Sequence, residues 1–381
     1  MKCDRRPARV CALAGSFTAL LVACGGGGGG ELPAGPSALS NAPSPSSPSP
    51  APGSPSPGAP APSAGGSGAI PTPQTIAGKP QVGQIRARSG QVIENVHVSN
   101  LNGSCIVIDG VSDVTIRDSE IGPCGTDGDP NAQGVDIHNG SDIRILRNVI
   151  HDVSSAVYAA SSAHPLVMDR NYVYNVRGPL PRGQMIQFNG VSGGSAGSKV
   201  TCNVSDAMPG VRHGVQHGNT AAGIEDHINL FSSPGLAHDR TEIAYNRLRG
   251  GSKVSTSGSG IMIGDGDGGH VNAHHNTIVD VVNAGAGIAG GTNVSFDDNR
   301  IYLSRDNSAY VNVGMYVWGQ AGASCAGHTM RNNRIWTLNS LGALNPFWDG
   351  GNCGAVDLSG NVLGDASLSP AIFDEVPSAC R

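Results

Sequence analysis

A short polar signature recurs along the chain. In each copy, alternating apolar and polar residues lead into an Asn or Asp, and an apolar residue usually follows. The copies are centred on Asp118, Asn148, Asn171, Asn203, Asn246, Asn276, Asn299, Asn333 and Asn361. Because alternation with a period of two is typical of a strand, each copy predicts a short strand that bends at the amide. The chain therefore contains an internal repeat.

The spacing of the repeat is irregular, and its intervals range from 23 to 43 residues. A second apolar strand precedes most copies, at residues 105–110, 134–140, 185–191, 260–266, 286–292, 314–320 and 355–361. A constant local signature with variable spacing is typical of a solenoid, since insertions collect where a turn faces solvent. Each coil is expected to contain at least two strands.

From about residue 92 to residue 363, such a chain resembles the right-handed parallel β-helices of the pectate-lyase-like superfamily. The resemblance implies an all-β, single-stranded right-handed parallel β-helix with an Asn ladder, in which stacked amides satisfy the bent backbone. The expected column is Asn148, Asn171, Asn246, Asn276, Asn299 and Asn333. The resemblance defines chemistry poorly, because similar coils carry lyases, hydrolases, epimerases, adhesins and phage tailspikes.

The N-terminus has the features of a bacterial export signal. Basic residues precede an apolar run from Val10 to Ala23, which is too short to span a bilayer. The run ends in Leu21-Val22-Ala23-Cys24, which resembles a lipobox and implies cleavage before Cys24 and lipid attachment to it. Gly25 then favours the outer membrane, on its periplasmic or cell-surface face. An ordinary secretory signal with a chance Cys is the alternative.

The next segment, up to about Lys79, is rich in Gly, Pro, Ser and Ala and cannot bury enough apolar surface to fold. It is interpreted as a tether with a mean reach of ~40 Å. The sequence thus divides into a signal peptide (1–23), a lipidated Cys with its tether (24–79) and a β-helix domain (80–381). We expect contact with the membrane through the lipid anchor alone.

Six of the nine cysteines lie in the β-helix domain, and none has CxxC spacing. An even number in an exported domain indicates disulfides. Proximity in sequence favours two pairs and leaves a third: Cys105–Cys124, Cys325–Cys353 and Cys202–Cys380. The net charge of −5, the absence of a basic stripe and an aromatic content of 4% argue against a nucleic-acid partner. We expect a monomer.

The outward positions of the first strand in each coil predict a polar strip. Aligning these strands on inward pairs such as Ile106/Ile108 and Ile261/Ile263 leaves the outward residues in columns. The expected substrate-binding strip contains Asp136, His138, Tyr158, Gln187, Asn189 and Asn229, and Arg249 is expected to bind substrate beside it. At ~4.8 Å per coil, it has the length of a short oligosaccharide, and we expect a polysaccharide, an acidic glycan in particular. The alternative is that outward positions are polar simply because they are solvated.

The densest ionisable cluster surrounds the strand at 227–231. It comprises Glu225 and Asp226 before this strand, Asp265 and Asp267 after the strand of the next coil, and Arg249 and Lys253 on the connecting loop. Adjacent carboxylates repel each other unless a cation or solvent relieves the repulsion, so they predict either an acid with a raised pKa or a Ca²⁺ site. The structural alternative is that these Asp and Gly residues only form turns.

Two reactions use side chains of these types. A glycoside hydrolase would use Glu225 or Asp226 as proton donor and Asp265 as the second carboxylate. The resemblance implies a polysaccharide lyase, in which Ca²⁺ on Asp265, Asp267 or Glu225 neutralises a uronate. Its base would be Lys253, Arg249 or His227. We expect a lyase ahead of a hydrolase, with Ca²⁺ as the one expected cofactor; a non-catalytic glycan-binding or adhesive lipoprotein is the opposing class.

Overall fold

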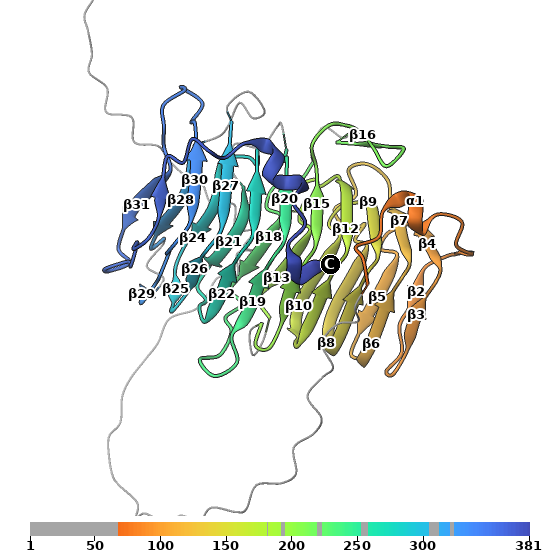
Figure 1. Ribbon diagram of the computed structural model, residues 1–381. Coiled ribbons are helices and arrows are strands. Elements are labelled where there is room, and N and C mark those ends of the chain that lie inside the picture. Colours follow the sequence, from red (N-terminus) through yellow and green to blue (C-terminus); the bar gives the residue numbers. More distant parts are fainter. Residues whose placement is uncertain are drawn as a thin grey trace, which may run out of the picture.

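The computed structural model describes residues 68–180, 182–191, 195–218, 223–252, 258–304, 312–320 and 324–381. Over these residues the chain winds as a right-handed parallel β-helix, as expected, and successive coils lie side by side along its axis (Figure 1). Each full coil contributes strands to three faces, which we name the front, middle and back sheets. Strands of adjacent coils pair in parallel, so each coil completes the hydrogen bonds of its neighbour.

The front sheet comprises β2 (Ile85–Arg86), β5 (Ile106–Asp109), β8 (Val135–Leu146), β10 (Val157–Ala163), β13 (Ile186–Asn189), β18 (Ile228–Phe231), β21 (Ser259–Asp265), β24 (Ala284–Ile288), β28 (Val313–Trp318) and β31 (Phe347–Gly351). The middle sheet comprises β3 (Val92–Glu94), β6 (Ser112–Arg117), the second half of β8, β11 (Leu166–Asp169), β14 (Lys199–Thr201), β19 (Thr241–Ala244), β22 (Val271–His274) and β26 (Ser295–Asp297). Strand β8 therefore continues through the corner between the two sheets.

The back sheet comprises β1 (Gln81–Val82), β4 (His97–Asn100), β7 (Glu120–Cys124), β9 (Val149–Val153), β12 (Tyr172–Val176), β15 (Val204–Asp206), β20 (Arg247–Arg249), β23 (Thr277–Val279), β27 (Arg300–Leu303), β30 (Arg334–Thr337) and β32 (Val362–Leu363). The remaining elements are α1 (Pro73–Ile76), the hairpin β16 (Gly210–Arg212) and β17 (Val215–His217), the pair β25 (Gly291–Thr292) and β29 (Cys325–Ala326), and the 3-10 turns η1 (Pro370–Asp374) and η2 (Ser378–Cys380).

The Asn ladder lies at the corner between the middle and back sheets, as expected. Asn276 is representative: its Nδ2 donates to Ile243 O (2.9 Å) and to Asn299 Oδ1 (3.0 Å), and its Oδ1 accepts from Asn246. The ladder runs through Asn148, Asn171, Asn203, Asn246, Asn276, Asn299, Asn333 and Asn361. It satisfies backbone groups that the bend would otherwise leave unpaired.

The first copy of the repeat was centred one residue too early in the sequence. Ser119, not Asp118, occupies the corner, and its backbone N–H donates to Asn148 Oδ1 (3.1 Å). Asp118 is the preceding residue, with φ 51°, and Arg147 and Tyr245 hold the equivalent left-handed positions before Asn148 and Asn246. The corner therefore has a left-handed residue followed by an inward polar one.

Inward apolar side chains fill the coil interior. On the front sheet the expected pairs, such as Ile106/Ile108 and Ile261/Ile263, are fully buried. The last coil differs, because β31 pairs with β28 through Phe347 and Trp348, whereas residues 355–361 were expected to supply that strand. Asp357 instead bridges to Thr329 on the side of the middle sheet.

Three additions cover the back sheet. Helix α1 buries Ile76 at one end, and η1 packs on β20 and β23 with Phe373 buried. The C-terminal segment lies across this face, and the β16–β17 hairpin projects beside it (Figure 1). Residues 70–76, which the sequence assigned to the tether, thus belong to the packed structure. All three expected disulfides form, and Cys202–Cys380 fixes the C-terminal segment. No helix among the described residues is long and apolar enough to cross a membrane.

Candidate functional site

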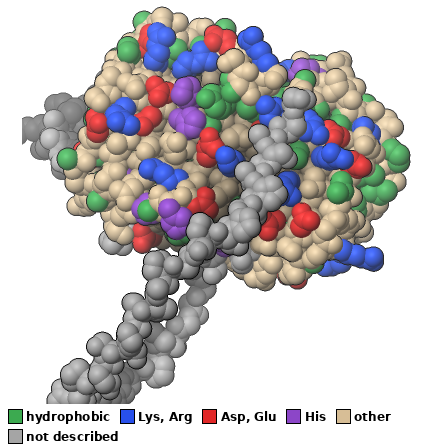
Figure 2. All heavy atoms as spheres, turned by 60° about the horizontal axis from the view of Figure 1, so that its bottom comes forward, with side chains coloured by type: hydrophobic (Ala, Val, Ile, Leu, Met, Phe, Trp, Pro, Cys, Tyr) green, Lys and Arg blue, Asp and Glu red, His purple; other side chains and the backbone are tan. Residues whose placement is uncertain are grey.

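The outward face of the front sheet carries the candidate site. Parallel register places Asp136, Tyr158, Gln187 and Asn229 on four successive coils in one column. His138 and Asn189 lie in the next column, separated by Ala160. The structure therefore brings the six residues of the predicted strip onto one face. On the face that Figure 2 shows, acidic, basic and His side chains are interspersed.

Asp226 lies two residues before β18 and is 5% exposed. Its Oδ1 accepts a hydrogen bond from Ser259 Oγ (2.7 Å), and its Oδ2 accepts one from Asn229 Nδ2 (2.7 Å). Burial raises the pKa of Asp226 to about 7, the neighbouring Glu225 carboxylate adds to the rise, and the two hydrogen bonds oppose it. Asp226 can therefore hold a proton near neutral pH.

Asp265 supplies a second carboxyl from the adjacent coil. It ends β21 and pairs with Phe231 of β18 across a register shift. Burial raises its pKa, and a hydrogen bond from Asn229 opposes the shift. Asp265 also contributes repulsion that raises the pKa of Asp226, so the two groups sense each other's charge. Loss of a proton from one carboxyl is therefore costly while the other is ionised.

Asn229 joins the two carboxyls, and it is 4% exposed. Its Oδ1 is buried, and among the described residues no donor bonds to it. A buried acceptor without a hydrogen bond destabilises the fold by about 1–3 kcal/mol. Such atoms are therefore uncommon unless a ligand or a titratable proton donates a hydrogen bond to them. A ligand hydroxyl or a protonated carboxyl of the pair would satisfy this oxygen.

The phenol of Tyr316 lies on the later-coil side of Asp226 and Asp265. Tyr316 of β28 is 3% exposed, and its hydroxyl donates to Met262 Sδ (3.2 Å). The ring lies over Gly287, where a Cβ would stand 2.4 Å from its nearest ring carbon. Burial raises the pKa of Tyr316, and the charges of Asp226 and Asp265 raise it further. Tyr316 therefore stays a neutral hydroxyl, close enough to the two acids for their charges to affect its pKa.

The earlier coils of the strip form a second polar group. His138 Nε2 lies 3.1 Å from Asp136 Oδ1, but without hydrogen-bond alignment, so this buried oxygen lacks a donor among the described residues. Burial raises the pKa of Asp136, and His138 opposes the rise. The Arg182 guanidinium lies 4.1 Å above the Tyr158 ring centroid. Tyr158 also accepts a hydrogen bond from Asn189 Nδ2.

Several predicted site residues lie elsewhere. Arg249 was expected beside the strip but belongs to the back sheet, where it pairs with Asp206 (2.7 Å) and stacks over the Phe373 ring (3.8 Å). Its strand β20 follows the Asn corner, so its side chain projects from a different face. His227 was considered as a base, but it is fully buried between Ser205 Oγ and Gly250 O, and burial lowers its pKa to about 4.

The remaining predicted residues, Glu225, Asp267 and Lys253, differ in where they lie. Glu225 is half-buried beside Asp226. Asp267 is exposed, and its Oδ1 accepts from Gly268 N (2.8 Å) and Ser324 Oγ (3.3 Å). Lys253 lies outside the described residues. The described residues thus bring Glu225, Asp226 and Asp265 to one place.

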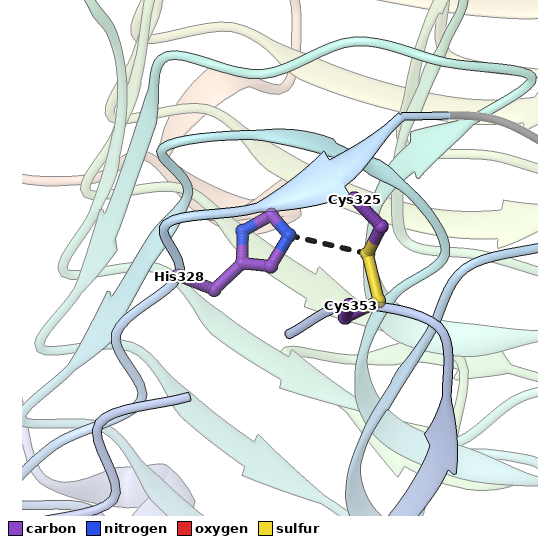
Figure 3. Close-up of side chains that lie close together, drawn as sticks. All are labelled: Cys325, His328 and Cys353. Atoms are coloured by element: carbon purple, nitrogen blue, oxygen red, sulfur yellow. Dashed lines mark hydrogen bonds between the residues drawn. A yellow bond between two sulfur atoms is a disulfide. The ribbon is translucent and has the colours of Figure 1, made fainter. Parts of the chain in front are cut away.

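Side chains that could bind a metal ion come close together at one place in the described residues. In the described part of the chain, Cys325, His328 and Cys353 are the one set of three ligand side chains within 4.8 Å of one another. Asp265 and Asp267 belong to no such set among the described residues, and the Ca²⁺ site expected there stays a prediction. Figure 3 shows the cysteine set, in which the two sulfurs form a disulfide and His328 Nε2 lies 3.2 Å from Cys325 Sγ.

The tautomer of His328 also disfavours a metal at the cysteine set. Val294 N donates to His328 Nδ1 (3.3 Å), so Nε2 carries the proton and points it at the sulfur. A metal on Nε2 would require a proton on Nδ1, against the Val294 N–H. The set is therefore a disulfide with a histidine donor.

Sequence reasoning missed three residues of this face. Ser259 lies in a Gly-Ser-Gly run that reads as a turn, and Arg182 follows a Pro-rich corner. Trp348 is on β31, a strand that was assigned to residues further along the chain. Its pairing with Tyr316 could have been found from the aromatic alternation Met-Tyr-Val-Trp followed by Phe-Trp.

Residues 82–203, less than half of the chain, match a family model described as the right handed beta helix region. The chain matches no curated protein significantly. Among solved structures it is similar to a GH87 α-1,3-glucanase catalytic domain in complex with nigerose (13% identity, TM-score 0.43, 74% of this chain and 56% of that chain). It is also similar to the mannuronan C-5 epimerase AlgE4 A-module of Azotobacter vinelandii (13%, 0.42, 75% and 82%) and to tailspike protein 2 of bacteriophage CBA120 (11%, 0.37, 74% and 42%).

The chain spans a little over half the length of the glucanase catalytic domain it matches. Identities and TM-scores this low carry no argument about chemistry. The stacked parallel strands define the class of protein, a right-handed parallel β-helix, and its chemistry depends on the side chains of the front sheet.

Proposed function

We propose that the protein binds a polysaccharide along the front sheet and hydrolyses its glycosidic bonds at Asp226 and Asp265. The observation that carries this proposal is a pair of desolvated carboxyls on adjacent coils, with Asp226 holding its proton up to a pKa of about 7. Glycoside hydrolysis requires one carboxylic acid and one carboxylate on either side of the scissile bond. The amides of Gln187, Asn189 and Asn229 would bond sugar hydroxyls beside them.

In the proposed reaction, Asp226 donates its proton to the glycosidic oxygen as the bond to the anomeric carbon breaks. Asp265 either attacks that carbon to form a glycosyl ester, which water then hydrolyses with Asp226 as the base, or removes a proton from the water that attacks the carbon directly. The negative charge of Glu225 and Asp265 stabilises the positive charge that develops on the sugar ring. Asn229 orients both carboxyls, and its Oδ1 would receive a hydrogen bond from a sugar hydroxyl.

Hydrolysis is proposed ahead of elimination, which reverses the order expected from the sequence. A lyase needs positive charge against the uronate carboxylate and a base for the α proton. Among the described residues, no Lys, Arg or His forms an ion pair with Asp226 or Asp265, and Arg249 and His227 are committed elsewhere. An acidic site also repels a uronate, so a neutral glycan fits the acid pair better.

A glycan-binding protein without catalysis is the second candidate. It is favoured by the hydrogen bonds from Ser259 and Asn229, which occupy both Asp226 oxygens. For catalysis, substrate binding must release one of these oxygens toward the glycosidic bond. If neither is released, the strip would recognise glycan and leave it intact.

The test is incubation of the purified protein with neutral polysaccharides (α-glucan, β-glucan, xylan, mannan) and with pectate and alginate, with and without EDTA. New reducing ends without ultraviolet absorbance support hydrolysis, whereas absorbance of unsaturated ends would establish a lyase. Asp226→Asn and Asp265→Asn should each lower turnover by ~10²-fold or more. The control is Asp113→Asn, at a 68% exposed carboxylate on the middle sheet. Binding of a polysaccharide with no new ends on any member of the panel would favour the second candidate.

A further inference from the structure

An aromatic surface continues the front sheet beyond the acid pair. Trp318 ends β28, and Trp348 is the second residue of β31. Their ring centroids are 5.8 Å apart with an interplanar angle of 62°, and Trp348 lies 6.2 Å from Tyr316. Trp348 is 39% exposed and Trp318 is half-buried. Two large indoles thus meet solvent on the face that carries the polar strip.

Glycines make room for these rings on the sheet. A Cβ at Gly350 would stand 2.6 Å from Trp318 Cγ, just as one at Gly287 would overlap the Tyr316 ring. Without those side chains, the rings can lie over the neighbouring coil. A ring in this position presents part of its π face outward, which suits an apolar ligand surface.

Register places the indoles in line with the acid pair. Trp318 lies two strands beyond β21, which ends in Asp265, and Trp348 lies three strands beyond it. At ~4.8 Å per strand, these separations are roughly 10 and 14 Å. A glycan with one bond at the acid pair therefore reaches the indoles only if it continues along the sheet by more than one sugar ring.

We propose that Trp318 and Trp348 form a stacking subsite for a pyranose ring of a polysaccharide, distal to the bond at Asp226 and Asp265. The inference rests on the proposed function for the position of the cleaved bond. The C–H groups on the faces of a pyranose match the face of an indole, and an exposed indole pair on a polar surface is better explained by a ligand than by folding. The subsite makes the protein prefer long chains to short oligosaccharides.

The protein offers a direct optical test, because it contains three tryptophans and the third, Trp336, lies on the back sheet. Trp336→Phe therefore leaves fluorescence from the subsite alone, and adding Asp226→Asn prevents turnover during titration. The probes are the six polysaccharides of the panel, followed by oligosaccharides of increasing length from any that binds. We expect a saturable emission change with a polysaccharide and with the longer oligosaccharides.

Removal of the indole separates binding from chemistry. Trp348→Ala should weaken binding of the long chains by about tenfold and raise their KM, while kcat and the turnover of the shortest substrates stay near the wild-type values. Trp348→Phe should recover part of the affinity. Wild-type KM for long chains in both Trp348→Ala and Trp318→Ala would overturn the subsite, as would the absence of any emission change across the panel.

Two further outcomes have defined readings. Saturable binding at the indoles without cleavage supports the subsite and contradicts the proposed hydrolysis. An emission change that follows protein concentration rather than glycan, with a larger mass in light scattering, would assign the indoles to contact with a second copy and overturn the proposal.

Discussion

Ionisation of Asp226 opposes stability, and it also removes the proton that the proposed chemistry uses. Its folded pKa, about 7, exceeds the ordinary pKa of an aspartate, about 3.8, so ionising it in the folded state costs free energy. Protonated Asp226 stabilises the folded protein fully below the pKa that this residue has in the unfolded chain. This stabilisation is lost as the pH rises through its folded pKa of about 7. Stability and proton donation therefore decline over the same pH range.

This predicts that Asp226→Asn inactivates the protein and raises its melting temperature at pH 8. The expected gain is about 1–2 kcal/mol, because the amide keeps the shape of the side chain without the buried charge. Thermal unfolding at pH 4 should show a much smaller difference from the wild type. Asp113→Asn is the matched control, and an equal loss of stability at both pH values would contradict the reasoning.

A second titrating residue lies on the back sheet and acts with the opposite charge. His151 is 7% exposed between Glu120 (Nε2–Oε1, 3.1 Å) and Asp152 (Nδ1–Oδ2, 2.8 Å), and it stacks on Tyr174 with centroids 4.9 Å apart. Burial opposes the charged form, but the hydrogen bonds to Asp152 and Glu120 prevail and raise the pKa. The imidazolium therefore ties β7 to β9.

A His with a raised folded pKa contributes stability that is complete below its unfolded pKa, near 6.5, and is lost as pH rises through the folded pKa. We expect His151→Gln to be destabilising at pH 5.5 by on the order of 1 kcal/mol, and the difference from the wild type to shrink by pH 9. Urea unfolding at both pH values measures it. His238→Gln, at an exposed loop position, serves as the control.

At the scale of the element, the stacked corner can be read from sequence because one physical requirement recurs in every coil. The bend leaves backbone groups without partners, and an inward amide supplies hydrogen bonds to them. Residues such as Asn246 and Asn276 therefore mark the corner of each coil in the sequence. The same logic fixes the phase of the front strands and hence the neighbourhood of Asp226 and Asp265. Asp118 misled because it occupies the left-handed position directly before the inward residue, Ser119.

The features that the sequence did not predict depend on loops of variable length. Residues 338–346 separate β30 from β31, and this insertion hid the strand that carries Trp348. Arg249 was close to the acid cluster in sequence, but the corner at Asn246 turns its strand onto the back sheet. The number of residues between two positions of one coil therefore does not predict whether they lie on the same face. The alignment of strands between successive coils does predict it.

The ladder gives a prediction at this scale. Asn276→Ala should remove donors and acceptors that serve Ile243, Asn246 and Asn299, and it should cost ~1–3 kcal/mol in urea unfolding. Asn272→Ala is the control, since Asn272 faces outward on β22 in the same coil. Equal stability of the two variants would mean that the backbone at the corner finds other partners.

At the scale of the whole molecule, a solenoid has no single central core, and each coil depends on its neighbours. The C-terminal segment adds a longer connection, because Cys202–Cys380 and the Arg247–Phe373 hydrogen bond tie it across several coils of the back sheet. Helix α1 packs against the same sheet at the other end through Ile76. The front sheet is left to carry the candidate site.

The junction with the N-terminal segment bears on localisation. Ile70 and Ile76 pack against the back sheet, so the first described residues join the domain away from the front-sheet strip. A lipid anchor at Cys24 would thus hold the domain through a face that is not the candidate site. From Leu21-Val22-Ala23-Cys24 and Gly25 we propose an outer-membrane lipoprotein, in which the tether joins the domain at the back sheet and not at the glycan strip.

Cys24→Ser tests this arrangement directly, because a hydroxyl cannot accept the thioether-linked lipid. We expect the variant to leave the membrane fraction, or to remain with its signal uncleaved, while the wild type fractionates with outer membranes and incorporates labelled fatty acid. The purified variant should keep the melting temperature and glycan binding of the wild type, since residue 24 lies far in sequence from the packed structure that begins near Ile70. Cys3→Ser, within the expected signal, is the control for loss of a thiol. Fractionation of Cys24→Ser with outer membranes, cleaved and without label, would show that attachment does not depend on the lipid.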